Sequence, residues 1–172
     1  LRYCNQYEQL QNPDGRILIE YNNSFDTLDS LAISKRGIVN GDNERWKRCF
    51  WDLPNKPSSW EWLQSAVNEN IEYSGRQSII NWSKKGVGML RPTKDNPAYG
   101  KQGICVSRMG GLKTTIYTGE MYDQNTGVIV PYNHQNLLPI YCYCMSNDYV
   151  NEVRKLDKKL NVTSDTLIQV PI

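Results

Sequence analysis

Short apolar segments broken by glycine and proline constrain the fold of this chain more than any other feature. The longest apolar run, residues 137–145, has nine positions, whereas a membrane-spanning helix needs about 20. Four runs rich in β-branched and aromatic residues are bounded by turn residues and predict strands at 78–82, 103–107, 114–117 and 127–131. A further strand is expected at residues 16–21, after an Asp-Gly turn. The pattern favours a domain built around a sheet.

Helical spacing of apolar residues predicts several helices beside these strands. A short pattern covers residues 25–33, and residues 42–43 are expected to cap a short helix over 44–48. A helix is also expected to begin at residues 58–59 and to bury one face, formed by Trp60, Leu63 and Val67. Near the C-terminus, the run 137–145 and an amphipathic pattern over 147–160 predict two more helices.

We therefore expect an α+β domain with a central, twisted, mostly antiparallel sheet flanked by helices. A length of 172 residues suits a single domain. Residues 1–34 are expected to form a lead-in segment packed on the domain, and residues 35–172 the domain itself. The chain starts without Met and without an apolar leader, so we expect a fragment of a longer protein that carries no secretory signal.

The cysteine and histidine content argues against metal chemistry. Five cysteines without a framework spacing favour a reducing, cytoplasmic setting. The single histidine, His134, cannot build a His-based metal site, and we interpret Cys142 and Cys144 as packed thiols. We expect no metal, no cofactor and no membrane segment in this chain.

Positive charge is concentrated in two segments. The net charge is only +2, yet residues 76–113 hold eight basic residues against one acidic residue, and residues 35–48 carry a net charge of +3. If the two segments meet in space, they form a basic face that attracts phosphate groups. Trp82 and Tyr99 lie among these cations, which favours nucleic acid as the partner. The alternative is a solvated surface with scattered lysines.

A candidate catalytic loop lies within the basic region, at residues 96–99, Asn-Pro-Ala-Tyr. Amino-group DNA methyltransferases use Asn-Pro-Pro-Tyr to hold the amino group of an extruded adenine, and Ala98 replaces the second proline here. Catalysis would also require a strand, Gly-rich turn and helix for S-adenosylmethionine, and Gly86 and Gly88 lead into no apolar helix. We interpret the loop as a surface turn and expect no catalytic apparatus in this chain.

Other segments resemble the same group of enzymes. Residues 37–46, GIVNGDNERW, resemble the G-x-x-T-G-D-N-x-R-F signature of the specificity region of large N6-adenine DNA methyltransferases. These are single-chain restriction–modification enzymes of type IIG, with a TaqI-like C-terminal specificity domain. Asn40 replaces the usual Thr, and Trp46 replaces the usual Phe. Residues 73–82, YSGRQSIINW, resemble the family's Tyr-x-Gly-Arg segment, which runs into a strand ending in Trp.

Later segments match the family in the same order. Residues 117–123 and 128–131 resemble its central strands. Residues 137–146 resemble its helix that ends in an (Asn/Ser)-Ser pair. Residues 161–167, followed by 170–172, resemble its closing V-T-x-x-T-L and V-P elements. The resemblance extends from about position 30 to the end of the chain.

The resemblance implies a target recognition domain. Such a domain docks on double-stranded DNA and selects the sequence. A separate methyltransferase domain, earlier in the parent chain, binds S-adenosylmethionine and receives the flipped adenine. The parent would be a site-specific adenine DNA methyltransferase of a restriction–modification system, and its methyltransferase domain would be the second partner of this chain.

Side-chain chemistry suggests which residues contact DNA. Lysines are expected to hold phosphates and set the register, namely Lys84, Lys85, Lys94, Lys101 and Lys113. Arginines can do the same or bind guanine through two parallel hydrogen bonds, and the candidates are Arg36, Arg45, Arg76, Arg91 and Arg108. Asparagines can bind adenine, each worth about 1–3 kcal/mol of discrimination. The polar candidates are Asn40, Asn43, Asn81 and Thr114.

Other roles stay open for several of these residues and for the chain. Asp42 either caps a helix or helps to place backbone N–H groups near a phosphate, and Arg45 and Arg76 can pair with acids of the fold. A rival interpretation is a protein-docking module of the same enzyme, in which the basic face is incidental. A third is a stand-alone methyltransferase that uses residues 96–99, which predicts S-adenosylmethionine binding by this fragment.

Overall fold

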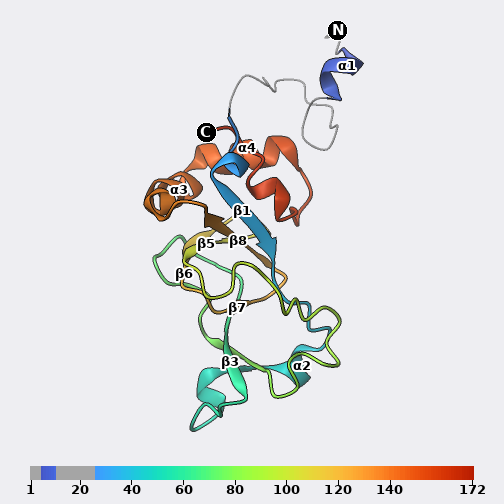
Figure 1. Ribbon diagram of the computed structural model, residues 1–172, viewed down its shortest axis with the longest axis vertical. Helices are drawn as coiled ribbons and strands as arrows, with labels where there is room; N and C mark the ends of the chain where they lie inside the picture. Colours follow the sequence, from blue (N-terminus) through green and yellow to red (C-terminus); the bar gives the residue numbers. More distant parts are fainter. Residues whose placement is uncertain (1–4, 11–25) are drawn as a thin grey trace.

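The computed structural model describes residues 5–10 and 26–172. These residues form an α+β fold, as predicted, with mostly antiparallel strands. The strands divide into two four-stranded sheets instead of the single central sheet that we expected. Figure 1 shows one sheet beside helices α3 and α4, and the other sheet toward helix α2 at the opposite end of the molecule.

The first sheet has the strand order β1-β8-β5-β6, and all its neighbouring pairs are antiparallel. Its strands are β1 (Ala32–Arg36), β5 (Gly103–Ser107), β6 (Thr114–Tyr117) and β8 (Thr126–Pro131). Ile104 and Ile129 face the C-terminal helices, whereas Cys105 and Val128 face a second apolar cluster. Every residue of β5 is buried, because both faces of this sheet are covered.

The second sheet has the order β2-β4-β3-β7. Its strands are β2 (Lys47–Cys49), β3 (Trp60–Gln64), β4 (Ser78–Asn81) and β7 (Met121–Tyr122). The β3–β7 pair is parallel and the other two pairs are antiparallel. Ile38, Trp46, Leu63, Ile80 and Met89 form a small core against this sheet. The sheet therefore has its own apolar cluster, separate from the core under α3 and α4.

Helices α2 and α4 begin at polar side-chain caps. The Asp42 side chain accepts a hydrogen bond from Arg45 N at 3.1 Å and caps α2 (Asn43–Trp46), as the sequence predicted. Helix α3 (Leu137–Met145) leads into α4 (Asn147–Leu156), whose first turn is capped by Ser146. Helix α1 (Gln6–Gln9) is a single turn. Both helices expected near the C-terminus are confirmed, although α4 ends before Leu160.

The helix expected from residues 58–59 is wrong, because this segment forms strand β3. Spacing of Trp60 and Leu63 suits a helix, but so short an isolated helix is marginal. Pairing of Trp62 with Ile79 gives the segment ladder hydrogen bonds instead. The predicted strands at 78–82, 103–107, 114–117 and 127–131 are confirmed to within one residue at each end.

The N-terminal expectations have mixed outcomes. The described part of the helix expected at 25–33, residues 26–33, forms no α-helix: the 3₁₀ turn Leu28–Ser30 leads into β1, and Leu28 N donates to Val170 O at 2.9 Å. The strand expected at 16–21 lies outside the described residues. Leu28 and Ala32 belong to the apolar core under α3 and α4. The boundary proposed at residue 34 falls inside β1.

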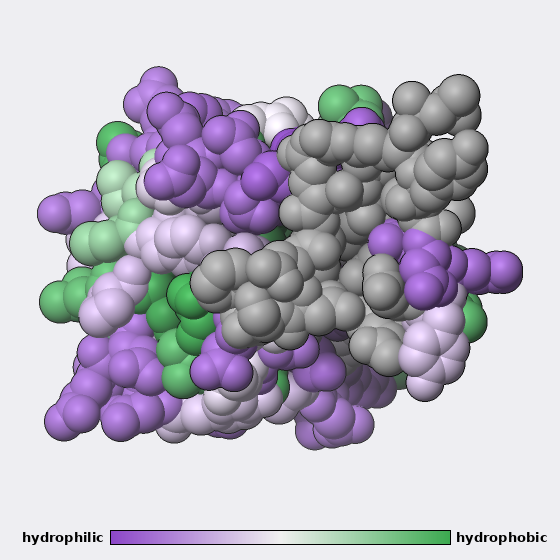
Figure 2. Space-filling model, turned by 90° about the horizontal axis from the view of Figure 1, so that it is seen from above, coloured by the Kyte–Doolittle hydropathy of each residue, from purple (hydrophilic) through white to green (hydrophobic). Residues whose placement is uncertain are grey.

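Figure 2 views the molecule from the end at which Figure 1 shows α1 and α4. Hydrophilic residues dominate the coloured surface there, with a smaller hydrophobic area. The exposed side chains of α4 include Asp148, Asn151 and Lys155. Among the residues that the structure describes, no helix has the length and apolar character needed to cross a bilayer.

Tyr122 of β7 connects the two sheets. Its hydroxyl donates to Lys35 O of β1 at 3.1 Å and accepts from Asn96 Nδ2 at 2.8 Å. Its carbonyl accepts from Ile38 N at 2.7 Å, directly after β1. Gly37 allows this approach, because a Cβ there would lie 2.2 Å from Tyr122 O.

Replacement of Gly37 by alanine tests this joint. We expect Gly37→Ala to lower the free energy of unfolding by about 3 kcal/mol or more, because its Cβ meets backbone oxygens that cannot move independently. The matched control is Gly111→Ala, whose Cβ meets nothing closer than Lys113 Cε at 3.6 Å. The control should change stability by less than about 1 kcal/mol in urea denaturation. Equal stability of both variants would contradict the interpretation.

Candidate nucleic-acid interface

Two basic segments that are far apart in the sequence meet in space. Val39 and Arg91 exchange backbone hydrogen bonds of 2.9 and 2.8 Å, and Leu90 N donates to Asn40 O at 3.4 Å. A Cβ on Gly88 would lie 3.4 Å from the Trp46 ring. Residues 38–46 and 82–92, here called the paired loops, therefore form one continuous surface.

Four cationic side chains are exposed on the paired loops, namely Arg45, Lys84, Lys85 and Arg91. The Arg45 guanidinium lies over the Trp46 ring, 4.6 Å from its centroid. Residues 82–92 contain no acidic residue. Asp42 and Glu44 are the acids of the other loop, and Asp42 is engaged as the α2 cap. The surface combines several cations with one supporting aromatic ring.

The 82–92 loop is held in a defined conformation from inside. Met89 and Trp82 pack into the core of the second sheet. Lys85 has a positive φ of 47°, followed by Gly86 at 75°. Gly86 is buried, and a Cβ there would lie 2.4 Å from Pro92 Cβ. The two lysines are therefore presented on a tight turn whose inner side is packed against protein.

The side chains of Asn40, Asn43 and Asn81, in or next to the paired loops, form hydrogen bonds within their own segments. Asn40 Nδ2 donates to Asn43 Oδ1 at 2.8 Å, and Asn40 Oδ1 accepts from Asp42 N at 2.9 Å. Asn81 Oδ1 accepts from Ser83 N and from the Ser83 hydroxyl. Adenine recognition through Asn40, Asn43 or Asn81 would compete with these bonds, because the Oδ1 atom of each already accepts a hydrogen bond.

The remaining cations are spread over other parts of the fold. Arg36 and Lys94 are exposed on segments that adjoin the paired loops, at the end of β1 and three residues after Arg91. Lys101 is exposed beside the Gly100–Gly119 backbone contact. Lys113 is half-buried after a turn whose Gly110 carbonyl accepts from Arg154 of α4. Lys101 and Lys113 are therefore not brought to the paired loops.

Arg108 and Thr114 require a correction, because both are buried. Arg108 donates to Val162 O at 2.7 Å and to Gln124 O at 2.8 Å, and burial, followed by the nearby Arg36, lowers the pKa of its guanidinium. The Thr114 hydroxyl donates to the carbonyls of Leu112 and Cys144. These two side chains stabilise the fold and leave the set of candidate DNA contacts.

Asn96 and Tyr99 of the candidate catalytic loop are also engaged inside the fold. Asn96 Nδ2 donates to Arg36 O at 3.0 Å and to Tyr122 Oη at 2.8 Å, and Asn96 Oδ1 accepts from Ala98 N at 3.0 Å. The Tyr99 ring packs edge-on against Tyr122, with centroids 5.7 Å apart. Ala98 is fully buried. In this arrangement, residues 96–99 are a structural turn whose polar groups already have partners.

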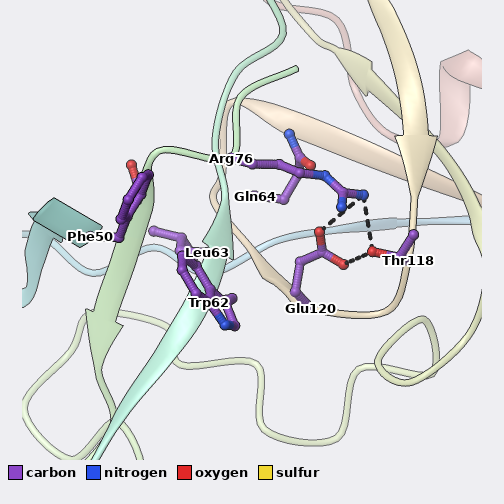
Figure 3. A pocket seen from close by; sticks show the side chains of 8 residues that line it. Phe50, Trp62, Leu63, Gln64, Arg76, Thr118 and Glu120 are labelled. Atoms are coloured by element: carbon purple, nitrogen blue, oxygen red, sulfur yellow. Dashed lines mark hydrogen bonds and ion pairs between the residues drawn. The ribbon is translucent and has the colours of Figure 1, made fainter. Parts of the chain in front are cut away.

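A pocket of about 470 Å³ lies on the second sheet, away from the paired loops, and we call it the aromatic pocket. It is lined by Phe50, Trp62, Leu63, Gln64, Arg76, Ser78, Thr118 and Glu120. Figure 3 shows Phe50 and Trp62 on one side and the Arg76, Thr118 and Glu120 side chains on the other. The sequence did not reveal this pocket, because no pattern marks Phe50 or Trp62 as exposed.

Arg76 belongs to this pocket and not to the basic surface. Its Nη2 donates to Thr118 Oγ1 at 2.9 Å and lies 3.3 Å from Glu120 Oε1, so Arg76 does pair with an acid of the fold. Thr118 in turn donates to Glu120 Oε2 at 2.7 Å. The Arg76 guanidinium also lies over the Tyr73 ring at 4.7 Å. Its ion pair leaves it less available to a phosphate than the exposed arginines.

The thiols and acids form no evident metal centre. Across the described ranges, no cluster of three or more His, Cys, Asp or Glu side chains could hold a metal ion. Cys144 is buried as expected, whereas Cys142 is exposed on α3, so the packed-thiol interpretation fails for Cys142.

No protein-family model matches the chain, and no curated protein is significantly similar to it.

Truncation of Arg108 tests its assignment to the fold. We expect Arg108→Ala to cost about 2–4 kcal/mol, because it leaves two carbonyls without a donor and creates a void. The control is Arg36→Ala, at an exposed position, which should change stability by about 0.5 kcal/mol or less. Urea denaturation measures both. Loss of stability in the control alone would reverse the assignment.

Replacement of Asn96 tests the structural role of the candidate catalytic loop. We expect Asn96→Ala to lower the free energy of unfolding by about 1–3 kcal/mol, because the Tyr122 hydroxyl and Arg36 carbonyl lose their donor. Lys94→Ala, at an exposed position in the same loop, should have an effect near zero. Thermal unfolding of both variants measures the difference. If the Asn96→Ala variant were as stable as the unsubstituted protein, the Asn96 amide would be free for another role.

Proposed function

We propose that this chain is a duplex-DNA recognition domain that binds through the paired loops. The observation that carries the proposal is the meeting of residues 38–46 and 82–92, which places Arg45, Lys84, Lys85 and Arg91 on one exposed surface. Such a group of cations attracts phosphates by releasing condensed counterions. The tight turn at Lys85 and Gly86 limits the conformational entropy that these lysines lose on binding.

The side chains divide into two roles in this proposal. Lys84 and Lys85 hold phosphates and set the register on the duplex. Arg45 and Arg91 are suited to guanine, because a guanidinium can donate two parallel hydrogen bonds to its major-groove edge. Trp46 supports Arg45 from below, at 4.6 Å, and so reduces the number of orientations that the guanidinium samples. Arg36 and Lys94 extend the cationic surface at its border.

The resemblance of residues 37–46 to a methyltransferase specificity signature supports the more specific form of the proposal. In that form the domain selects the DNA sequence for an N6-adenine methyltransferase of a restriction–modification system. A separate domain of the parent protein then binds S-adenosylmethionine and carries out the transfer. The signature residues form the capped turn into α2, which is one of the two paired loops.

A protein-docking module is the second candidate, and one observation favours it. Phe50, Trp51 and Trp62 are 43%, 60% and 45% exposed and contact one another, with Phe50–Trp51 centroids at 4.9 Å and Phe50–Trp62 centroids at 5.8 Å. Exposed aromatic clusters are common at protein interfaces. Salt separates the two candidates, because an aromatic interface responds weakly to ionic strength whereas phosphate contacts respond steeply.

Fluorescence anisotropy with a pool of random duplex DNA, titrated from low to moderate salt, tests the proposal. We expect Lys84→Gln/Lys85→Gln to weaken binding and to reduce the slope of log K against log salt by about two, because each neutralised phosphate contributes about 0.9 to that slope. The matched control is Lys158→Gln/Lys159→Gln, another exposed pair of neighbouring lysines that lies just after α4. The control should leave the slope unchanged.

Two results would count against the proposal. If the intact parent protein did not bind DNA at low salt, the proposal of DNA recognition would be wrong. Equal loss of affinity in the two double variants would show that binding depends on total charge and not on the paired loops.

If the paired loops bind DNA, the variants Arg45→Ala and Arg91→Ala should each lose base preference at a separate position of the site, by about 1–3 kcal/mol each. Selection of preferred sites with each variant measures this loss.

A further inference from the structure

The aromatic pocket has one wall of exposed rings. Phe50 and Trp62 are 43% and 45% exposed, and their centroids lie 5.8 Å apart at an interplanar angle of 59°. Trp62 belongs to β3, and Phe50 is held beside β4 by a hydrogen bond from its N–H to Gln77 O at 2.9 Å. Because both rings are anchored on the sheet, they offer a preformed surface on which a flat ligand can stack against one ring and meet the tilted second ring edge-on.

The opposite wall is polar and contains two atoms that have no hydrogen-bond partner among the described residues. Gln64 is fully buried and donates through Nε2 to Ser65 O and Ser74 O, yet its Oε1 has no hydrogen-bond partner among the described residues. Arg76 Nε is likewise buried without a partner in that part of the chain. Both residues line the pocket. The wall therefore combines an unused acceptor with an unused donor.

These two atoms are buried, so a ligand must move a side chain to reach them. The Arg76 head group is the natural one to move. Its side-chain partners, Thr118 and Glu120, also line the pocket, and Arg76 and Glu120 are both partly exposed. The shift breaks the hydrogen bonds from Arg76 Nη2 to Ile116 O at 3.2 Å and to Thr118 Oγ1 at 2.9 Å. In return, a ligand that supplies one donor and one acceptor would satisfy two buried groups that have no partner among the described residues.

We propose that the aromatic pocket binds a nucleobase that is not stacked within a duplex. A nucleobase has a flat face for Trp62 and Phe50, and its pairing edge carries a donor next to an acceptor, which match Gln64 Oε1 and Arg76 Nε. An apolar ring would leave both buried atoms unsatisfied. A paired base in a duplex presents neither its face nor its pairing edge, so the ligand is an extruded base or a free nucleoside.

Ligand-observed NMR with the uncharged nucleosides adenosine and cytidine tests this proposal. Nucleosides carry no phosphate, so the phosphate contacts proposed for Lys84 and Lys85 do not contribute to their binding. We expect saturable transfer from the folded protein to the base protons, and at least tenfold weaker binding in Trp62→Leu and Phe50→Leu, which keep an apolar side chain but lose the ring. Tyr132→Leu is the matched control, because Tyr132 is 65% exposed and lies outside the pocket.

Absence of saturable binding by either nucleoside overturns the proposal, and so does an equal loss of binding in Tyr132→Leu. A hairpin duplex with one extrahelical adenine, compared with the same hairpin fully paired, identifies the source of the base. Displacement of the nucleoside by the bulged hairpin at much lower concentration assigns the base to DNA. Displacement by neither hairpin assigns it to a free nucleoside.

The test also separates this inference from the proposed duplex binding. Lys84→Gln/Lys85→Gln should leave nucleoside binding unchanged, because the lysines do not line the pocket. Trp62→Leu should leave the salt dependence of duplex binding unchanged, because Trp62 lies outside the paired loops. Loss of nucleoside binding in the lysine variant would overturn the assignment to the aromatic pocket.

Discussion

The buried hydroxyl of Tyr122 is the contact on which the arrangement of this molecule depends. It joins the end of β1, the 96–99 turn and strand β7, which itself pairs with β3 of the other sheet. Burial raises the pKa of this hydroxyl, so it stays protonated and keeps its hydrogen bond to Lys35 O at physiological pH. The chain leaves β1 at Gly37 and enters the paired loops directly, so this joint also sets where those loops lie.

Strand β4 relates the two surfaces to which we assign ligands. Ser78, at its start, lines the aromatic pocket, and the loop from Trp82 follows its last residue. Four residues of strand span about 13 Å. The basic surface and the aromatic pocket therefore adjoin opposite ends of one short strand. A protein partner that contacted only the aromatic rings would leave the cations at the other end of the same strand unexplained.

Much of the fold could be predicted from the sequence, because several strands are short β-branched runs between glycine turns. Residues 60–64 failed because Trp60 and Leu63 suit a helix by spacing, and only pairing with β4 decides otherwise. The second sheet gains its fourth strand through the two-residue parallel pair of β3 with β7, which no local sequence pattern indicates. The charge pattern showed which segments could form a basic face, but burial of Arg108 depends on a carbonyl 54 residues away.

Hydrogen-bonding capacity that the fold leaves unused is the clearest guide to function in this chain. Asn40, Asn96 and Arg108 have side chains suited to bases or phosphates, yet their polar groups are bonded within the protein. Using them for a ligand would cost the interactions that hold the turns in place. Among the described residues, no hydrogen bond engages the exposed cationic side chains of the paired loops. A recognition surface built from them gains affinity mainly from phosphate contacts, which are the same for every sequence, so discrimination must come from the few side chains that also reach base edges. Arg45 is the best supported of these, because a ring lies beneath its guanidinium.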